Sequence, residues 1–324
     1  MLPVVKELLT NVVVKYVKHM VPDWKIAGAV EFNATLRSGA DLAWDRVSLS
    51  HADIAFLQYT GGTTGVAKGA VLTHGNIVAN LQQLSAWLAH DLLEGKEILV
   101  CPLPLYHVYA LTCSLVFMKI GAHAVLVTNP RDMHAFLHDL KRQPFSVIIG
   151  VNTLYRALLD APGFAEVDTS HLKLANAGGM AVQQVVAQRW KAATGVPLIE
   201  SYGLSETSPG ALSNPVNIED WTGNIGMPFP STQVAVLDDD DRELPVGEVG
   251  EICVRGPQVM SGYWNRPDET NKVFTRDGWL RTGDMGVMDE HGCFRITDRK
   301  KDMILVSGFK VFPNQIEDAV ALHP

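Results

Sequence analysis

The sequence predicts an α/β protein with a mostly parallel sheet, followed by a smaller β-rich region. From about Asp53 to Leu204, short apolar runs alternate with stretches of helical periodicity, the pattern of strands joined by helices in a layered domain. After Pro209, glycine and proline become frequent and separate short apolar runs, which indicates a β-rich subdomain to about Thr297. With 47% hydrophobic and 19% charged residues, the composition is that of a globular protein.

The apolar runs of the first region are short enough to be buried strands. We expect strands at residues 55–59, 98–101, 124–127, 147–151, 174–177 and 198–201. A helix is predicted after a capping Thr73 or Asn76, with apolar residues at helical spacing from Ile77 to Leu88, and another over residues 182–193. In the β-rich region, residues 233–237 and 251–254 are expected strands, and Asp238 to Asp241 a hairpin turn rather than a calcium site.

The first 25 residues predict a basic amphipathic helix. Its apolar side carries Val12, Val13, Tyr16 and Met20, and interspersed charges rule out a signal-peptide core. We expect this helix to pack on the domain, with weak attraction to anionic lipid as the alternative.

The stretch 97–119 resembles a membrane span because no charged residue lies between Glu97 and Lys119. Pro102 and Pro104 would break a spanning helix. A buried strand, a turn and a core helix from about Tyr109 are expected instead, and no transmembrane segment.

The formal net charge of −8 argues against a nucleic-acid-binding surface, which needs clustered Lys and Arg. It does not exclude ATP, whose charge can be met locally by Mg²⁺, backbone N–H groups and one or two cations. Four cysteines without a CxxC pair suit free thiols in a reducing compartment.

A glycine-rich motif follows the first expected strand. It comprises Thr60, Gly61, Gly62, Thr63, Thr64, Gly65 and Lys68. Glycines let the backbone turn its N–H groups toward oxyanions, and the hydroxyls and Lys68 add donors and charge. Here Lys68 precedes a glycine and a strand, so the motif is not a Walker A loop.

Two further motifs follow strands or turns. Residues 200–207 include Tyr202, which can stack on a base, and Glu206, which can hold Mg²⁺ beside phosphates. In residues 277–284, Asp284 offers acceptors for a ribose diol, and downstream Arg299 offers a planar fork of donors.

Together, in this order, the motifs resemble those of the adenylate-forming superfamily, which includes acyl-CoA synthetases, luciferases and peptide-synthetase adenylation domains. Residues 277–304 further resemble the signature of long-chain fatty-acyl-CoA synthetases, especially the bacterial enzymes. Ser205, Asp277 and Arg281 depart from the usual residues. The resemblance implies a layered α/β adenylating domain over residues 1–208, a distorted barrel over 209–297, and a hinge with the start of an α+β domain over 298–324.

The resemblance also implies a reaction in which a long-chain fatty acid and ATP give acyl-AMP and diphosphate, and coenzyme A then displaces AMP. It makes Thr60 to Lys68 the loop over the terminal phosphates, with Lys68 and Glu206 catalytic and Lys301 the hinge of the C-terminal domain. Adenine and carboxylate contacts would come from Gly178, Gly179, Met180, Tyr202 and Gly203, and a phosphate contact from Thr207. Asp284 and Arg299 would contact the ribose, and Glu206 and Thr63 would be ligands of Mg²⁺. His107 would line the acyl-carboxylate site.

The family's catalytic lysine is expected beyond Pro324. The family has a long segment before the glycine-rich loop, so the first part of the N-terminal domain is expected to be missing from this chain. We therefore expect a truncated ligase that is inactive or partial by itself. Two alternatives stay open: a catalytically incompetent ATP- or acyl-binding remnant, and a ligase for another carboxylic acid. The resemblance further suggests a cytoplasmic protein, peripheral on the inner face of the cell membrane, and a homodimer.

Overall fold

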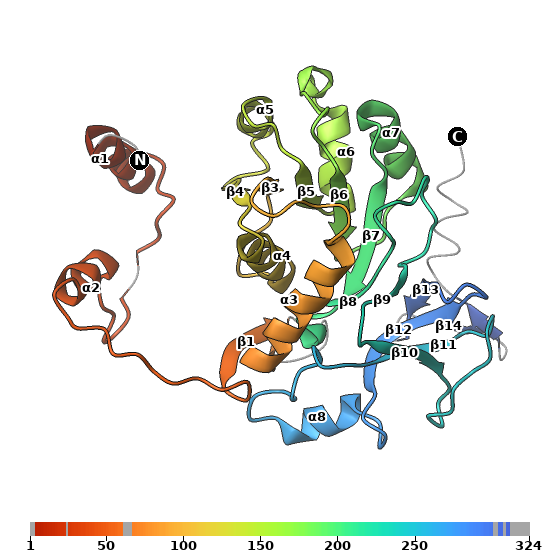
Figure 1. Ribbon diagram of the computed structural model, residues 1–324. Helices are drawn as coiled ribbons and strands as arrows, with labels where there is room; N and C mark the ends of the chain where they lie inside the picture. The colour runs from red at the N-terminus through yellow and green to blue at the C-terminus, as the bar shows by residue number, and fades with distance from the viewer. Residues whose placement is uncertain (1–3, 24, 61–66, 301–303, 307–308, 312–324) are drawn as a thin grey trace. The chain divides into compact units, whose positions relative to one another are not determined.

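The computed structural model describes residues 4–23, 25–60, 67–300, 304–306 and 309–311 (Figure 1). The chain divides into two units, residues 1–48 and 49–324. The second unit holds all the described site candidates and confirms the predicted α/β class.

The large sheet of the second unit has seven strands in the order β4–β3–β5–β6–β7–β8–β9. Pairs from β4 to β7 are parallel, and β8 and β9 join antiparallel at one edge. The strands are β3 (Ile98–Cys101), β4 (His123–Leu126), β5 (Val147–Gly150), β6 (Leu174–Gly178), β7 (Leu198–Gly203), β8 (Gly210–Ser213) and β9 (Met227–Pro228). Apolar runs form these central strands because both sheet faces are covered.

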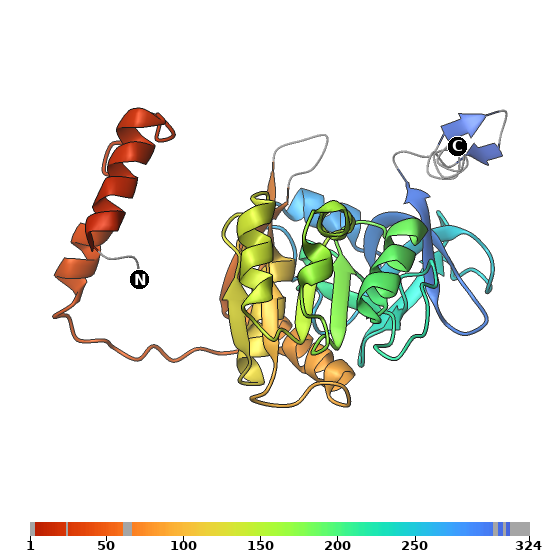
Figure 2. The ribbon, with the colours of Figure 1, turned by 90° about the horizontal axis from the view of Figure 1, so that it is seen from above.

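Helices cover the two faces of this sheet, an arrangement that can be followed in Figure 2. On one face, Phe136, Tyr155 and Trp190 come from three helices and are fully buried against the strands. These helices are α5 (Met133–Lys141), α6 (Asn152–Asp160), which is followed by a 3₁₀ turn η2 (Phe164–Glu166), and α7 (Gln184–Thr194). The other face packs against α3 (His74–Leu88) and α4 (Val108–Lys119).

Helix α3 begins where the sequence predicts. Thr73 is its N-cap and forms a capping box with Asn76: the Thr73 hydroxyl accepts from the Asn76 N–H at 3.1 Å, and Asn76 Oδ1 accepts from the Thr73 N–H at 3.0 Å. The box satisfies two backbone donors at the helix end. It fixes where α3 starts beside the site.

One predicted strand lies outside the parallel sheet. Residues 55–59 form part of β1 (Ile54–Thr60), which pairs antiparallel with β2 (Lys68–Thr73) in a separate two-stranded sheet. Seven residues separate the two strands, whereas a parallel connection needs a crossover of roughly a dozen or more. The expectation that this strand belongs to the alternating α/β series was therefore wrong.

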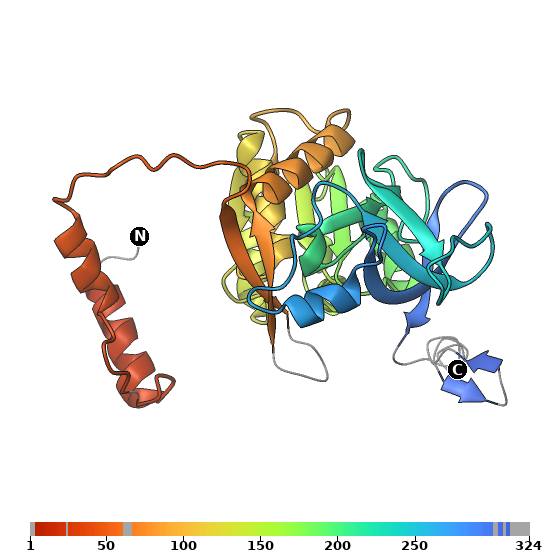
Figure 3. The same ribbon diagram turned by 90° about the horizontal axis from the view of Figure 1, so that it is seen from below.

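The β-rich region contains a four-stranded antiparallel sheet in the order β10–β11–β12–β13. Its strands are β10 (Gln233–Leu237), β11 (Gly250–Arg255), β12 (Leu280–Met288) and β13 (Phe294–Arg299). The aspartates after β10 form the predicted turn, in which Asp238 accepts from the backbone of Asp240 and Arg242. Between β11 and β12, α8 (Pro267–Val273) lies beside β2 (Figure 3). A short pair, β14 (Ile304–Val306) with β15 (Phe309–Val311), follows.

The first unit contains α1 (Val4–Val12), which continues as a short π-helical segment η1 (Val13–Val17), and α2 (Phe32–Gly39). Helix therefore ends earlier than residue 25, and Tyr16 and Met20 are exposed. Packing of this helix on the domain, or its attraction to lipid, stays a prediction, as do the three domain boundaries. No helix in the described ranges is long and apolar enough to cross a membrane.

Candidate active site

Two loops leave the carboxyl ends of β6 and β7, where ligands bind in open α/β sheets. The first starts at Gly178 and Gly179, and the second follows Tyr202 and Gly203. Because β6 and β7 are neighbours, the loops lie side by side. A Cβ atom at Gly203 would lie 1.8 Å from the Pro209 carbonyl oxygen. Only glycine fits there, which explains the Tyr-Gly pair of the motif.

Tyr202, Asp284 and Arg299 meet at one point. Asp284 and Arg299 face each other across β12 and β13, and Arg299 Nε lies 2.8 Å from Asp284 Oδ1. The Tyr202 hydroxyl donates to the other oxygen, Oδ2, at 2.6 Å. Burial raises the pKa of Tyr202, and the Asp284 carboxylate acts in the same direction. Three of the predicted nucleotide-site residues are thus assembled from two sheets.

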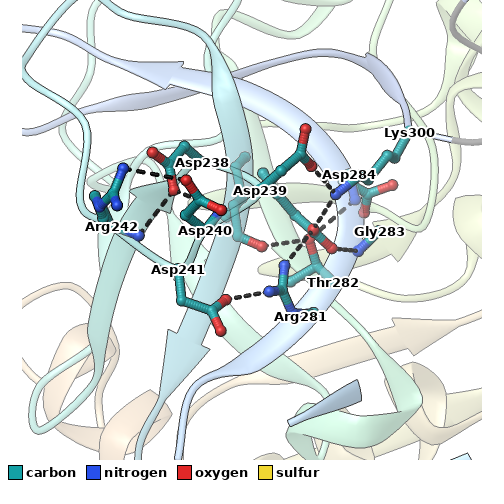
Figure 4. A network of polar contacts seen from close by, with 12 residues as sticks. Asp238, Asp239, Asp240, Asp241, Arg242, Arg281, Thr282, Gly283, Asp284 and Lys300 are labelled. Atoms are coloured by element: carbon teal, nitrogen blue, oxygen red, sulfur yellow. Dashed lines mark hydrogen bonds and ion pairs between the residues drawn. The ribbon is translucent and has the colours of Figure 1, made fainter. Parts of the chain in front are cut away.

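A buried carboxylate organises the backbone next to this cluster. Glu251, whose side chain is only 5% exposed, accepts from Arg281 Nη1 at 3.1 Å and Lys300 Nζ at 3.0 Å. It also accepts from the backbone N–H of Gly283 at 3.0 Å. In Figure 4, Arg281 and Lys300 also reach the aspartate turn at residues 238–241, with which they form ion pairs. The network therefore ties the part of β12 before Asp284 to the end of β13.

A second polar cluster surrounds Lys68 at the start of β2. Its ammonium lies 2.9 Å from Glu269 Oε2 on α8 and 4.8 Å from the centre of the Tyr263 ring. The Tyr263 hydroxyl donates to Glu206 Oε1 at 2.6 Å. Hydrogen bonds from Lys272 and then Lys68 lower the pKa of Glu269 to about 2. The Lys68 ammonium, the Tyr263 ring and the Glu206 carboxylate thus lie in a row, each in contact with the next.

Both clusters open onto one pocket with a volume of 1120 Å³. Most of the predicted site residues that the structure describes line it. They are Thr60, Lys68, His107, Gly178, Gly179, Tyr202, Gly203, Glu206 and Arg299.

The pocket continues as an apolar channel between α3 and α4. Leu174, Asn176 and Gly178 alternate along β6 and all line it, so it follows one face of β6 from end to end, about 13 Å at roughly 3.3 Å per residue. Trp87 of α3 and Phe117 of α4 form part of the side walls. Asn176 accepts from the Tyr109 hydroxyl at 2.6 Å, so this polar group within the channel is satisfied.

Trp87 lies on the α3 side of the channel. Along α3, Asn80 donates to the Gly210 carbonyl at 2.9 Å, and Trp87, two turns later, donates to the Asn214 carbonyl at 3.4 Å. The Trp87 ring packs edge-on against Phe229, with centroids 5.3 Å apart. Both aromatic rings line the channel.

His107 caps α4 at the pocket wall. Its Nδ1 accepts from the Tyr109 N–H at 3.3 Å, and partial burial lowers its pKa. Both observations favour a neutral imidazole. A position of His107 beside the acyl carboxylate stays a prediction.

The remaining candidates are placed differently. Among the described residues, Met180, Thr207 and Asp284 do not line the pocket. Met180 is 48% exposed, and the buried Thr207 hydroxyl donates to backbone carbonyls of its own turn. Gly61, Gly62, Thr63, Thr64, Gly65 and Lys301 lie outside the described residues.

Sequence reasoning missed Tyr263, Glu269, Glu251 and Trp87. Glu269 lies 201 residues from Lys68, and spacing carries no signal over such a separation. Arg281, which the sequence left without an interpretation, forms ion pairs with Glu251 and Asp241.

The fold and the pocket define an α/β protein in which a pocket with cationic and acidic side chains at one end continues as an apolar channel. The sequence profile described as "AMP-binding enzyme" matches residues 5–264. The chain belongs to this family.

Known relatives agree with this assignment. The chain is 52% identical over 320 residues to the long-chain-fatty-acid–CoA ligase of Escherichia coli O6:H1, covering 98% of this chain and 57% of that protein. It is 50% identical over 322 residues to the ligase of the same name from Haemophilus influenzae, with the same two coverages. The chain thus spans 57% of the length of these relatives.

Solved structures resemble the fold closely. ATP-bound MatB from Rhodopseudomonas palustris superposes with a TM-score of 0.77 at 32% identity, covering 87% of this chain and 55% of that one. O-succinylbenzoate coenzyme A synthetase from Bacillus subtilis, in complex with AMP, gives a TM-score of 0.73 at 28% identity, covering 85% and 56%.

Proposed function

We propose that this protein activates a long-chain fatty acid with ATP, giving acyl-AMP and diphosphate, and that the full-length protein transfers the acyl group to coenzyme A. The proposal rests on one observation: a polar pocket with a cation, a carboxylate and an aromatic ring opens into an apolar channel along β6. A fatty acyl chain joined to a nucleotide matches both parts. Relatives with 50–52% identity are long-chain-fatty-acid–CoA ligases, which supports the same substrate class.

The polar end suits the nucleotide. In this proposal Asp284 and Arg299 receive the ribose hydroxyls and the Tyr202 ring stacks on adenine. The contacts among these three side chains support the assignment. Gly178 and Gly179 border the position of the acyl phosphate at the channel mouth. Lys68 supplies positive charge for the terminal phosphates.

Glu206 is a suitable ligand for Mg²⁺. Its Oε1 is fixed by Tyr263, while within the described ranges nothing donates to Oε2. The same residues contain no group of three or more His, Cys, Asp or Glu side chains able to hold a metal. One carboxylate together with substrate phosphates is the usual way in which proteins bind Mg²⁺. Bound there, the ion would neutralise charge on the phosphates.

In the proposed reaction, a carboxylate oxygen of the fatty acid forms a bond to the α-phosphorus of ATP, and the bond to diphosphate breaks. Protein groups contribute by positioning both reactants and by stabilising the charge that moves to the leaving diphosphate. Coenzyme A thiolate then forms the thioester bond, and AMP leaves. This second step, with Lys301 as hinge, belongs to the proposal for the whole protein, as do dimer formation, a cytoplasmic location and peripheral membrane contact.

Mass spectrometry of acyl-AMP tests the proposal, with palmitate, ATP and Mg²⁺ supplied to this chain and to a version extended at both ends to the length of its relatives. We expect acyl-AMP from the extended protein at least. If both proteins are folded and neither makes acyl-AMP, the ligase proposal is wrong, and retained ATP binding would then favour the binding-remnant alternative. A profile peaking with short or aromatic acids would favour a ligase for another acid.

A further inference from the structure

Tyr263 contacts two groups of the phosphate end at once. Its hydroxyl donates to Glu206 Oε1 at 2.6 Å, and its ring centre lies 4.8 Å from the Lys68 ammonium. The first contact is charge-assisted, and the second is a cation–π interaction. One side chain therefore determines the separation of the carboxylate and the cation.

The fold holds Tyr263 in place through backbone contacts with β2. It forms a bridge with Ala70, and the neighbouring Trp264 N–H donates to the Gly69 carbonyl at 2.8 Å. On the other side of the bridge, the Val71 N–H donates to the Gly262 carbonyl at 2.9 Å. Tyr263 itself is only 9% exposed. It is thus a rigid support for the lysine that follows the glycine-rich loop.

Glu269 also contacts the Lys68 ammonium. The two side chains are only 18% and 24% exposed, and their charged atoms lie 2.9 Å apart. Neighbouring Lys272 and Arg266 also contact Glu269, at 2.7 and 3.5 Å. A carboxylate in this position binds the lysine as a phosphate oxygen would.

We propose that Tyr263 is a positioning residue that makes the site select a nucleoside triphosphate, and that Glu269 holds Lys68 until the terminal phosphates replace it. The hydroxyl of Tyr263 orients Glu206 toward the metal-bound phosphates, and its ring keeps Lys68 within reach of the same phosphates. AMP lacks the terminal phosphates, so its binding is independent of this arrangement. The inference rests on the proposed function and adds the means by which the site distinguishes ATP from AMP.

Equilibrium binding without turnover tests this role. Calorimetry on the 324-residue chain would measure the affinity for AMP and for α,β-methylene-ATP, each with and without Mg²⁺. Tyr263→Phe keeps the ring and removes the hydroxyl. We expect its affinity for the ATP analogue with Mg²⁺ to fall by about tenfold, the effect of one charge-assisted hydrogen bond, with AMP affinity unchanged.

Glu269→Gln tests the second half of the proposal and keeps the size of the side chain. A neutral amide competes less well than a carboxylate for Lys68, so we expect affinity for the ATP analogue to rise by about threefold or more. Glu248→Gln removes the same charge from an exposed position away from the site and should change neither affinity.

Two results would overturn the proposal: equal losses of AMP and ATP-analogue affinity in Tyr263→Phe, which would indicate a merely structural role, or no change in either. Unchanged or weaker binding of the analogue by Glu269→Gln would exclude the competition by Glu269. Failure of both the unsubstituted chain and the version extended at both ends to bind the analogue would overturn the proposed function as well. Normal binding with no effect of the variants would overturn this inference alone.

Discussion

The hydroxyl of Tyr202 donates a 2.6 Å hydrogen bond to Asp284 Oδ2, although the two residues are 82 positions apart in the sequence. Tyr202 belongs to the large sheet and Asp284 to the four-stranded sheet. The contact therefore joins the two sheets at the place where we propose the nucleoside to bind. It also keeps the aromatic ring and the carboxylate in a fixed relation before a ligand arrives.

Asp284→Asn should weaken AMP and ATP binding equally. The variant keeps the size of the side chain but loses the charge that faces Arg299, and a hydrogen bond to a charged group contributes about 1.5–3 kcal/mol. We expect losses of about tenfold or more in both affinities, measured by calorimetry. Asp240→Asn, an exposed neighbour of Arg242, is the matched control. A loss confined to ATP would contradict the ribose assignment.

Glu251→Ala should destabilise the fold. The substitution leaves Arg281, whose side chain is 21% exposed, and Lys300 without their shared buried partner. Removing one member of a buried ionic network costs about 3–5 kcal/mol. Urea unfolding should show a decrease of this order in the free energy of unfolding, whereas Glu248→Ala, on the surface, should stay within about 0.5 kcal/mol. Equal effects of the two substitutions would contradict the structural role of Glu251.

Stability should depend on pH through Glu200. This carboxyl is 6% exposed and accepts from the Val182 N–H at 2.9 Å, and burial raises its pKa from 4.5 to about 7. Between these two values the unfolded chain has lost the proton that the folded chain retains, so stability falls as pH rises and the loss is complete above about 7.

Glu200→Gln removes this titration. The variant should gain stability relative to the unsubstituted chain as pH rises, reaching about 3 kcal/mol at pH 8, measured by urea unfolding across the range. Glu219→Gln, at an exposed position, controls for the lost charge. A difference that does not vary with pH would show that the pKa of Glu200 is not raised in the folded protein.

Trp87→Leu should extend the accepted acyl chain. A smaller side chain opens space beside Phe229 in the wall of the channel, and each additional buried methylene contributes about 0.8 kcal/mol. Rates of acyl-AMP formation by the extended protein with acids of increasing length would then peak at a longer chain. Met118→Ala, a 72% exposed residue on α4, should leave the profile unchanged. The same unchanged profile in Trp87→Leu would show that Trp87 does not limit the length of the acyl chain.

Patterns local in sequence predicted most of the fold. Apolar runs and helical spacing located strands such as β3 and β5, and the capping residues Thr73 and Asn76 located the start of α3. The exception was β1, whose apolar run resembles the central strands but whose short connection to β2 makes it a hairpin.

The site was only partly predictable. Motif residues such as Tyr202 and Asp284 have a chemistry that spacing and family resemblance reveal. Tyr263 and Glu269 act through contacts with residues 57 and 201 positions away. Such pairs are created by packing between elements distant in the sequence, as where Glu269 of α8 meets Lys68 of β2, and no local pattern marks them.

The central claim is that one pocket holds the nucleotide and the acyl chain together. Binding of acyl-sulfamoyl adenosines with acyl groups of increasing length to the 324-residue protein tests this claim most directly. In these compounds a sulfamate replaces the acyl phosphate, so no reaction is needed. We expect affinity to rise by up to about fourfold per methylene until the acyl chain fills the channel, and then to level off. Affinity independent of chain length would contradict the claim, because the apolar channel would then not continue from the nucleotide site.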